Sequence, residues 1–261
     1  MKDIVPSSCH RLRLAFILAT LSLLCAGCLY HCFRRAAPYS AEEVESPNLA
    51  LDYVLYLGCL TLSAELAYLA FRFDGFRRHS DDGLLATVAV FALLAYRFDN
   101  RFVLSLALTS LAGWFGLKVP AFALVSPAAF RITAIGYGAI VAAAGAVLYR
   151  RGIKRHFLST YLHIAANVVF AAVVSGIDGE PRWTLYLGAL ALLSAGTIVL
   201  GVRFRRFAFV AYGTVYGYAG ISYAVLPHLR TDTAFLAYFV VTGSIVIVSL
   251  AVLARRFGRG E

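Results

Sequence analysis

Charged residues are scarce in this chain of 261 residues. Asp, Glu, Lys and Arg make up 15% of it, against about 25% in an average soluble domain. Apolar residues make up 61%, against roughly 45–50% in such a domain. A water-soluble fold cannot bury so large an apolar fraction. The composition therefore excludes a soluble globular protein and indicates a chain that crosses a membrane several times.

Motifs of nucleotide and zinc chemistry are also missing. The sequence has no Gly-x-x-x-x-Gly-Lys-Ser/Thr phosphate loop and no His-Glu-x-x-His helix. No connection between apolar runs exceeds about 17 residues, so no catalytic domain lies between them. The basic residues stand at the ends of apolar runs, which fits anionic lipid headgroups better than nucleic acid. We therefore expect no catalytic residue, metal, cofactor or nucleic-acid partner.

Nine apolar runs account for most of the chain. They are residues 14–33, 51–71, 83–96, 102–117, 132–149, 157–177, 183–202, 207–226 and 234–254. A helix needs about 20 such residues to cross a hydrocarbon core roughly 30 Å thick. Only Asp52 and Glu65 are charged within the runs. Because long continuous runs favour helices over barrel strands, we expect an all-α transmembrane bundle with eight or nine spans.

Two short runs and one broken stretch leave alternatives open. Residues 83–96 and 102–117 form either two short spans, which we favour, or a re-entrant hairpin. The stretch 119–130 contains Pro120 and Pro127 and is too short to cross a membrane alone. We expect an interfacial segment or a loop there.

The basic residues also predict the orientation of the chain. From residue 132 onward, ten Lys and Arg residues fall on one side of the membrane and two on the other. Short cytoplasmic loops are enriched in these residues, so we expect a cytoplasmic C-terminus. The first half shows the opposite imbalance, eight against four. The number of spans in that half therefore stays open by one.

Composition divides the chain into three parts. Residues 1–37 form an N-terminal hydrophobic helix, residues 38–50 an acidic connector, and residues 51–261 a multi-pass transmembrane domain. The first part has the basic start and small residues of a signal sequence. A retained helix is favoured, with a cleaved signal or lipidation at Cys28 as alternatives.

Three cysteines and a histidine of the first part share one helical face: Cys25, Cys28, His31 and Cys32. Structural zinc sites usually join two converging ligand pairs in accessible loops. Cysteine also packs well as a small apolar residue. We therefore interpret this face as a packing surface and not as a metal site.

Ionisable residues inside the runs are candidate functional residues, because such groups are costly in lipid. Glu65 shares a helical face with Thr61, Tyr68 and Arg72. That face must meet protein or water. Glu65 is therefore either part of a proton or cation relay or a structural hydrogen-bond partner between helices.

A second polar face is predicted in residues 157–177 and just before them. His156, Thr160, His163 and Asn167 follow helical spacing and form one narrow stripe. In residues 207–226, three tyrosines repeat that spacing: Tyr212, Tyr216 and Tyr223. His163 is the second relay candidate, again with a structural hydrogen bond as the alternative.

Small residues recur at the spacing of packed membrane helices. Gly213 and Gly217 are four residues apart, as are Gly138 and Ala142, and Gly220 follows in the same run as the first pair. Such positions let two helix backbones approach closely. We expect packing within the chain, with dimerisation as the alternative.

Two segments resemble a known group of proteins. YRFDNRFVLSLALTSLAGWFG (96–116) and GIKRHFLSTYLHIAANVVFAAVVSG (152–176) are similar to bacterial predicted membrane proteins that carry a domain of unknown function. The similarity covers roughly residues 38–253. The resemblance implies a multi-pass protein of the bacterial inner membrane, and it brings no activity, cofactor or catalytic residue with it.

The sequence thus predicts a non-enzymatic membrane component. It is either a small-solute or ion permease or an assembly partner, surrounded by the lipid bilayer and able to form a homo-oligomer or bind another membrane protein. The alternative is an intramembrane enzyme in which His163 and Asn167 form an acid–base pair.

Overall fold

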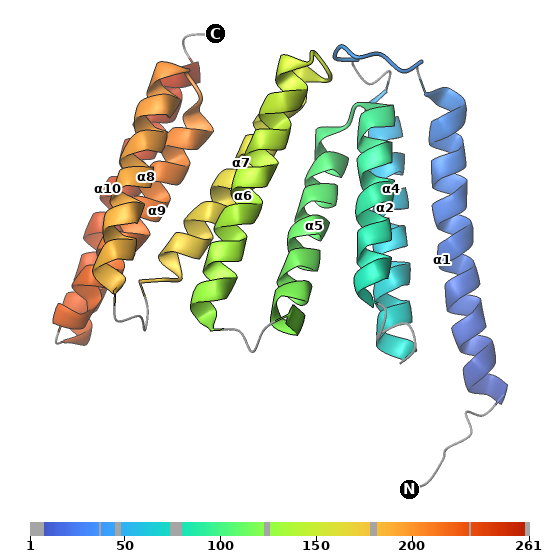
Figure 1. The fold of residues 1–261 in the computed structure, drawn as a ribbon, viewed down its shortest axis with the longest axis horizontal. Coiled ribbons are helices and arrows are strands. Elements are labelled where there is room, and N and C mark those ends of the chain that lie inside the picture. The colour runs from blue at the N-terminus through green and yellow to red at the C-terminus, as the bar shows by residue number, and fades with distance from the viewer. Residues whose placement is uncertain are drawn as a thin grey trace, which may run out of the picture. The chain divides into compact units, whose positions relative to one another are not determined.

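The computed structural model describes residues 8–36, 38–44, 48–73, 80–122, 126–177, 182–229 and 231–258. These residues are all-α, with 88% of the structure helical and no strand among them (Figure 1). The α-helices are α1 (Ser8–Arg35), α2 (Leu49–Arg72), α4 (Ser80–Phe98), α5 (Arg101–Phe122), α6 (Pro127–Arg150), α7 (Leu158–Val174), α8 (Trp183–Arg203), α9 (Phe207–Val225) and α10 (Asp232–Gly258). Two short 3-10 helices, η1 (Arg155–Phe157) and η2 (Leu226–His228), follow α6 and α9. The expected all-α class is confirmed.

The chain folds into two compact units. The first consists of residues 1–121 and 143–161, and the second of residues 122–142 and 162–261. Both α6 and α7 therefore contribute one part to each unit. Glu65 lies in the first unit and His163 in the second, so each is described with the partners in its own unit.

The first unit contains the antiparallel pair α1 and α2, which lie side by side (Figure 1). The side chain of Asn48 accepts a hydrogen bond from the Ala50 N–H at 2.9 Å and begins α2. Asn100 begins α5 in the same manner, since its Oδ1 accepts from the N–H groups of Phe102 and Val103. Such caps satisfy N–H groups that have no partner inside the helix.

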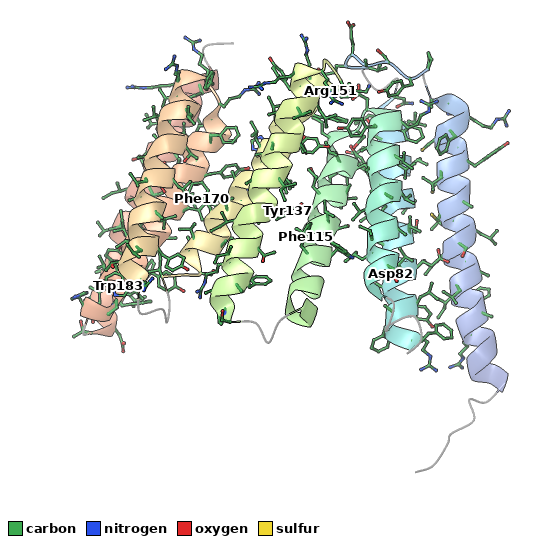
Figure 2. The ribbon with its side chains drawn as sticks, in the orientation of Figure 1. Asp82, Phe115, Tyr137, Arg151, Phe170 and Trp183 are labelled. Carbon is green, nitrogen blue, oxygen red and sulfur yellow. The ribbon has the colours of Figure 1, made fainter. Side chains whose placement is uncertain are left out.

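The second unit contains α8, α9 and α10, with α8 and α9 making the most extensive helix contact. Its core is a cluster of Phe170, Val173 and Ile177 from the α7 segment and Leu190 from α8. Tyr212 and Tyr216 of α9 pack against this cluster. Figure 2 shows Phe170 among the side chains of this part of the chain.

Three helices end in a turn with a left-handed residue. Asp99, Gly152 and Arg205, which follow α4, α6 and α8, have φ angles of 55°, 75° and 53°. In each turn the next N–H reaches back to a carbonyl of the last helical turn: Asn100 to Ala95, Ile153 to Leu148 and Arg206 to Gly201, at 3.0, 3.1 and 2.8 Å. This geometry satisfies carbonyl groups at the helix end and turns the chain sharply.

Within the described residues, six helical segments are long and apolar enough to cross a membrane. They are Ala15–Arg35, Leu49–Arg72, Pro127–Arg150, Arg155–Val174, Trp183–Arg203 and Asp232–Phe257. α5 contributes a shorter apolar segment, Arg101–Gly116. α4 includes the charged residues Asp81, Asp82 and Arg97, which lower the hydropathy of that helix. α9 includes four tyrosines and three glycines, which lower the hydropathy of α9.

The apolar surface of these segments is widely exposed. No residue in the most apolar part of α10 is buried. Leu192 of α8 and Ile247 of α10 are 77% and 69% exposed. Surfaces of this kind are stable in hydrocarbon and unstable in water. The exposed apolar helices therefore indicate contact with a lipid bilayer.

The stretch 119–130 differs from the sequence prediction. α5 continues to Phe122 and α6 begins at Pro127, so most of the stretch is helical and the expectation of a loop was wrong there. Proline fits the first position of a helix, because its N–H would lack a partner there in any case. Pro127 therefore starts a helix and does not break one.

Candidate functional site

Glu65 joins α2 to α1. The hydroxyl of Ser22 in α1 donates a hydrogen bond to Oε1 of Glu65. Thr61, one turn earlier, is buried, and its hydroxyl donates to the carbonyls of Leu57 and Gly58 at 2.6 and 3.0 Å. Tyr68 is half-buried on the following turn. The partner of Glu65 is thus a neighbouring helix, as in the structural alternative for this residue.

His156 lies outside the helix that carries the other members of its predicted stripe. It belongs to η1, whereas α7 begins at Leu158. A 3-10 helix turns through about 120° per residue instead of 100°, so the spacing that joined His156 to His163 does not hold. Thr160 lies on α7 and is buried, but in the first unit. The predicted stripe is therefore divided.

His156 belongs instead to a buried ion cluster that consists of Asp99, Lys154 and His156. Oδ1 of Asp99 is 2.5 Å from Nε2 of His156, and Oδ2 is 2.9 Å from Nζ of Lys154. The Asp99 and Lys154 side chains are 3% and 2% exposed. Buried ions are stable only where opposite charges and hydrogen bonds replace their hydration. The ion cluster meets this condition.

The acidic connector is fixed to the ion cluster. The Val44 N–H donates to Oδ2 of Asp99 at 2.6 Å, and Nζ of Lys154 donates to the carbonyl of Glu42 at 3.0 Å. The Lys154 N–H also donates to the carbonyl of Ala41 at 2.8 Å. The ion cluster therefore links the 38–44 connector, the α4–α5 turn and the α6–η1 turn of the first unit.

Two members of the ion cluster have left-handed backbones. Asp99 has a φ of 55° and Lys154 a φ of 44°. Asp adopts this conformation several times more readily than most residues, whereas Lys has no such preference. Strained conformations persist only where the surrounding contacts determine them. The pairing with Asp99 and the two connector carbonyls supply those contacts for Lys154.

Sequence reasoning missed Asp99 and Lys154. Asp99 was visible only as the end of an apolar run, and Lys154 only as one of the basic residues that set the orientation. The two residues are 55 positions apart, and no local spacing shows that their turns meet. The sequence Phe98-Asp99-Asn100, in which Asp precedes a helix-capping Asn, indicated a turn. It did not indicate that this turn meets the turn at Lys154.

In the second unit the structure brings together the polar stripe of α7 and the tyrosine stripe of α9. The amide nitrogen of Asn167 donates to the carbonyl of His163 at 2.8 Å, and the hydroxyl of Tyr216 donates to Oδ1 of Asn167 at 3.0 Å. The ring of Phe209 stacks on His163 with centroids 5.1 Å apart, and Tyr212 meets it edge-on at 5.7 Å. We refer to these five residues as the His163 cluster. Tyr223 is 46% exposed and has no contact with the cluster among the described residues.

The His163 cluster holds an imidazole nitrogen in apolar surroundings. Nδ1 of His163 is buried and has no hydrogen-bond partner among the described residues. A buried polar atom without a partner costs about 1–3 kcal/mol, so such atoms are often functional. Both polar groups of Asn167 are used, and an amide side chain is neither an acid nor a base near neutral pH. Proton chemistry in this cluster therefore rests on the imidazole.

The hydrogen bond between Tyr216 and Asn167 predicts a small stability effect. Tyr216→Phe is expected to destabilise the protein by about 0.6 kcal/mol, and by no more than about 1.7, the range for polar contacts between membrane helices. Thermal unfolding in detergent measures the effect, with Tyr223→Phe as the exposed control. An effect no larger than that of Tyr223→Phe would show that the bond contributes nothing to stability.

Glycines bring neighbouring helices into close contact in the second unit. A Cβ atom on Gly138 would lie 2.5 Å from Val169 and 3.1 Å from the carbonyl of Ala165, so α6 approaches the backbone of α7. A Cβ on Gly217 would lie 3.2 Å from Oγ of Ser194, and one on Gly220 would lie 2.3 Å from Leu190. Gly217 and Gly220, together with Gly213, place α9 against α8 within one chain.

Three cysteines of α1 face α2. Cys25, Cys28 and Cys32 are buried, as is Cys59 of α2, and all four are free thiols. His31 is exposed. In the part of the chain that the structure describes, no three His, Cys, Asp or Glu side chains are grouped so that they could hold a metal ion. The four thiols therefore serve as small apolar residues in the contact between α1 and α2.

No protein-family model, no curated protein and no solved structure matches this chain.

Proposed function

We propose that the chain is a multi-pass protein of the bacterial cytoplasmic membrane, with eight or nine spans and its C-terminus in the cytoplasm. The six long apolar helices support a multi-pass arrangement. The excess of Lys and Arg on one side of the later runs supports the orientation. The bacterial source stays a prediction from the resemblance of residues 96–116 and 152–176. α9 would cross with α8, because the two helices pack closely.

Topology reporters test this arrangement. Alkaline phosphatase, which is active only outside the cytoplasm, and green fluorescent protein, which fluoresces only inside it, are fused after the full chain. We expect fluorescence and no phosphatase activity from C-terminal fusions. A phosphatase-active C-terminal fusion would contradict the orientation, and recovery of the chain in the soluble fraction would contradict the membrane assignment.

We further propose that the protein is a non-enzymatic permease for an ion or a small solute, in which His163 takes up a proton. The observation that carries this proposal is the buried Nδ1 of His163, which has no hydrogen-bond partner among the described residues and lies in the apolar segment Arg155–Val174. Ionisable residues in such segments commonly mark proton and solute pathways. An imidazole takes up and releases protons near neutral pH more readily than any other side chain.

The hydrogen bonds of the cluster favour a permease over an enzyme. An acid–base pair of His163 and Asn167 would require contact between the two side chains. Asn167 instead bonds to the main-chain carbonyl of His163 and to Tyr216. Glu65 has Ser22 as its partner, so we assign it a structural role and place the proton chemistry at His163 alone.

Proton flux into liposomes tests the assignment. The purified protein is reconstituted with a trapped pH-sensitive dye, and a potassium diffusion potential drives proton entry. We expect flux above that of protein-free liposomes, loss of most of it in His163→Ala, and no change in Glu65→Gln, which keeps the hydrogen-bond acceptor for Ser22. His228→Ala is the control for removal of an exposed histidine.

Two results would contradict the permease. If the parent protein gave no flux above empty liposomes, it would not conduct protons under this driving force. If His163→Ala kept the parent flux while it remained folded by circular dichroism, His163 would not be the group that takes up the proton.

A further inference from the structure

The turn after α6 is strongly basic. Between residues 150 and 156 the sequence reads RRGIKRH. Lys154 points inward and is paired with Asp99, so its charge is neutralised within the first unit. The side chains of Arg150, Arg151 and Arg155 are exposed, and we refer to these three residues as the arginine turn. Figure 2 shows Arg151 at this end of α6.

The backbone of the arginine turn is fixed on both sides. Gly152 has a φ of 75°, and its N–H donates to the carbonyl of Tyr149, while the Ile153 N–H donates to the carbonyl of Leu148, both at 3.1 Å. Lys154 anchors the far side through the ion cluster and the connector carbonyls. A turn whose backbone is already fixed loses less conformational entropy when it binds a ligand.

Two of the described carboxylates next to this turn in the first unit are bound to other residues, and Glu42, whose main-chain carbonyl binds Lys154, is exposed. Asp99 pairs with Lys154 and His156, and Glu43 pairs with Arg101 at 2.6 Å. No ion pair joins the arginine turn to an acidic side chain within the described ranges, and Arg155 lies over the ring of Tyr149 at 5.8 Å. The three guanidinium groups therefore have positive charge available to an external anion.

An exposed apolar column on α6 leads to the arginine turn. Ala144, Val147 and Arg151 are spaced at i, i+3 and i+7 and are all exposed, so they share one face of the helix. Ala143 is also exposed, and two small residues leave room for a chain to lie against the helix. Tyr149, beside the turn, is 47% exposed, as expected of a residue at the membrane interface.

We propose that the arginine turn binds the phosphate headgroup of an anionic phospholipid, whose acyl chain lies along Ala144 and Val147. Guanidinium groups match the oxygens of a phosphate with paired hydrogen bonds. Clustered basic residues at the membrane surface attract anionic lipid. A free phosphate ion shares the headgroup chemistry but has nothing to place on the apolar column. This site is independent of the proposed permease.

Lipid binding to the intact protein in neutral detergent tests the site. Titration with phosphatidylglycerol, followed by native mass spectrometry, gives an apparent dissociation constant, with phosphatidylcholine as the neutral comparison. Replacement of Arg150, Arg151 and Arg155 by Gln is expected to weaken phosphatidylglycerol binding by about a hundredfold, since each basic residue near the surface contributes several-fold. The charge-matched control replaces Arg203, Arg255 and Arg256, which are exposed in the second unit.

The remaining arms identify the ligand and separate binding from folding. Inorganic phosphate at millimolar concentration is expected not to displace the lipid, and replacement of the three arginines by Lys is expected to keep most of the binding. Equal losses in both Gln triples would overturn the proposal, as would equal affinity of the parent for the two lipids. Displacement by inorganic phosphate would assign the turn to free phosphate and overturn the lipid assignment. If the Gln triple does not fold, Arg151→Gln alone must still weaken phosphatidylglycerol binding several-fold for the proposal to stand.

Discussion

Replacement of Asp99 by Asn is expected to destabilise the first unit by about 3–5 kcal/mol, the cost of leaving a buried charge without its partner. Lys154 is 2% exposed and Asp99 is its only ion-pair partner among the described residues. Asn also tolerates the left-handed backbone of this position. The loss of stability would therefore come from the missing charge and not from strain in the backbone of the turn.

The four buried cysteines of α1 and α2 provide the measurement. Cys9, the fifth cysteine of the chain, is first replaced by Ser. A thiol-reactive fluorophore then labels the four buried thiols only when the first unit opens, so fluorescence during heating gives an unfolding temperature. Asp82→Asn, an exposed carboxylate of α4 in the same unit, is the matched control and is expected to change little. Figure 2 labels this residue.

A double variant distinguishes the ion pair from other causes. Asp99→Asn combined with Lys154→Met removes both charges, and we expect it to recover most of the stability that the single variant loses. If the double variant were less stable than Asp99→Asn by the full cost of Lys154→Met, the two residues would be independent. The ion cluster would then not be the source of the effect.

Gly213→Val is expected to destabilise the second unit by about 1–3 kcal/mol or more, as in other overpacked interiors. A Cβ atom at this position would lie 2.6 Å from Oγ1 of Thr197 and 2.7 Å from the carbonyl oxygen of Ser194. The carbonyl belongs to the α8 backbone and cannot rotate away. α9 would have to move from α8, and the polar contacts of the His163 cluster would loosen with it.

Unfolding in sodium dodecyl sulfate, followed by circular dichroism, measures this loss. Gly196→Val is the matched control, because a Cβ atom on Gly196 of α8 would have no neighbouring atom within 4 Å and the same β-branched residue is introduced. Equal destabilisation by the two variants would show that helix propensity, and not the contact with α8, accounts for the effect.

The class of the protein could be predicted from its sequence because lipid imposes a simple composition. Apolar runs near 20 residues long can satisfy their backbone only as helices, and each predicted run from 51 onward lies largely within one helix of the structure. The run 157–177 is longer than its helix at both ends, since α7 begins at Leu158 and ends at Val174. Apolar composition does not distinguish a helix from the turn beside it.

The candidate sites were less predictable because they depend on which helices meet. Helical spacing placed His163 and Asn167 on one face and Tyr212 and Tyr216 on another, but no periodicity within one helix identifies its neighbour. Asp99 and Lys154 lie in turns, where periodicity gives no information. The stripe failed at His156 because this residue lies in a 3-10 helix before α7 begins.

The composition of α9 has a consequence for the assembly of the protein during synthesis. Its tyrosines and glycines suit contact with α8 and the α7 segment. The ribosome releases α8 first, and the three-residue turn 204–206 keeps the next helix beside it. α8 and α9 would therefore leave the translocation channel together as a helical hairpin.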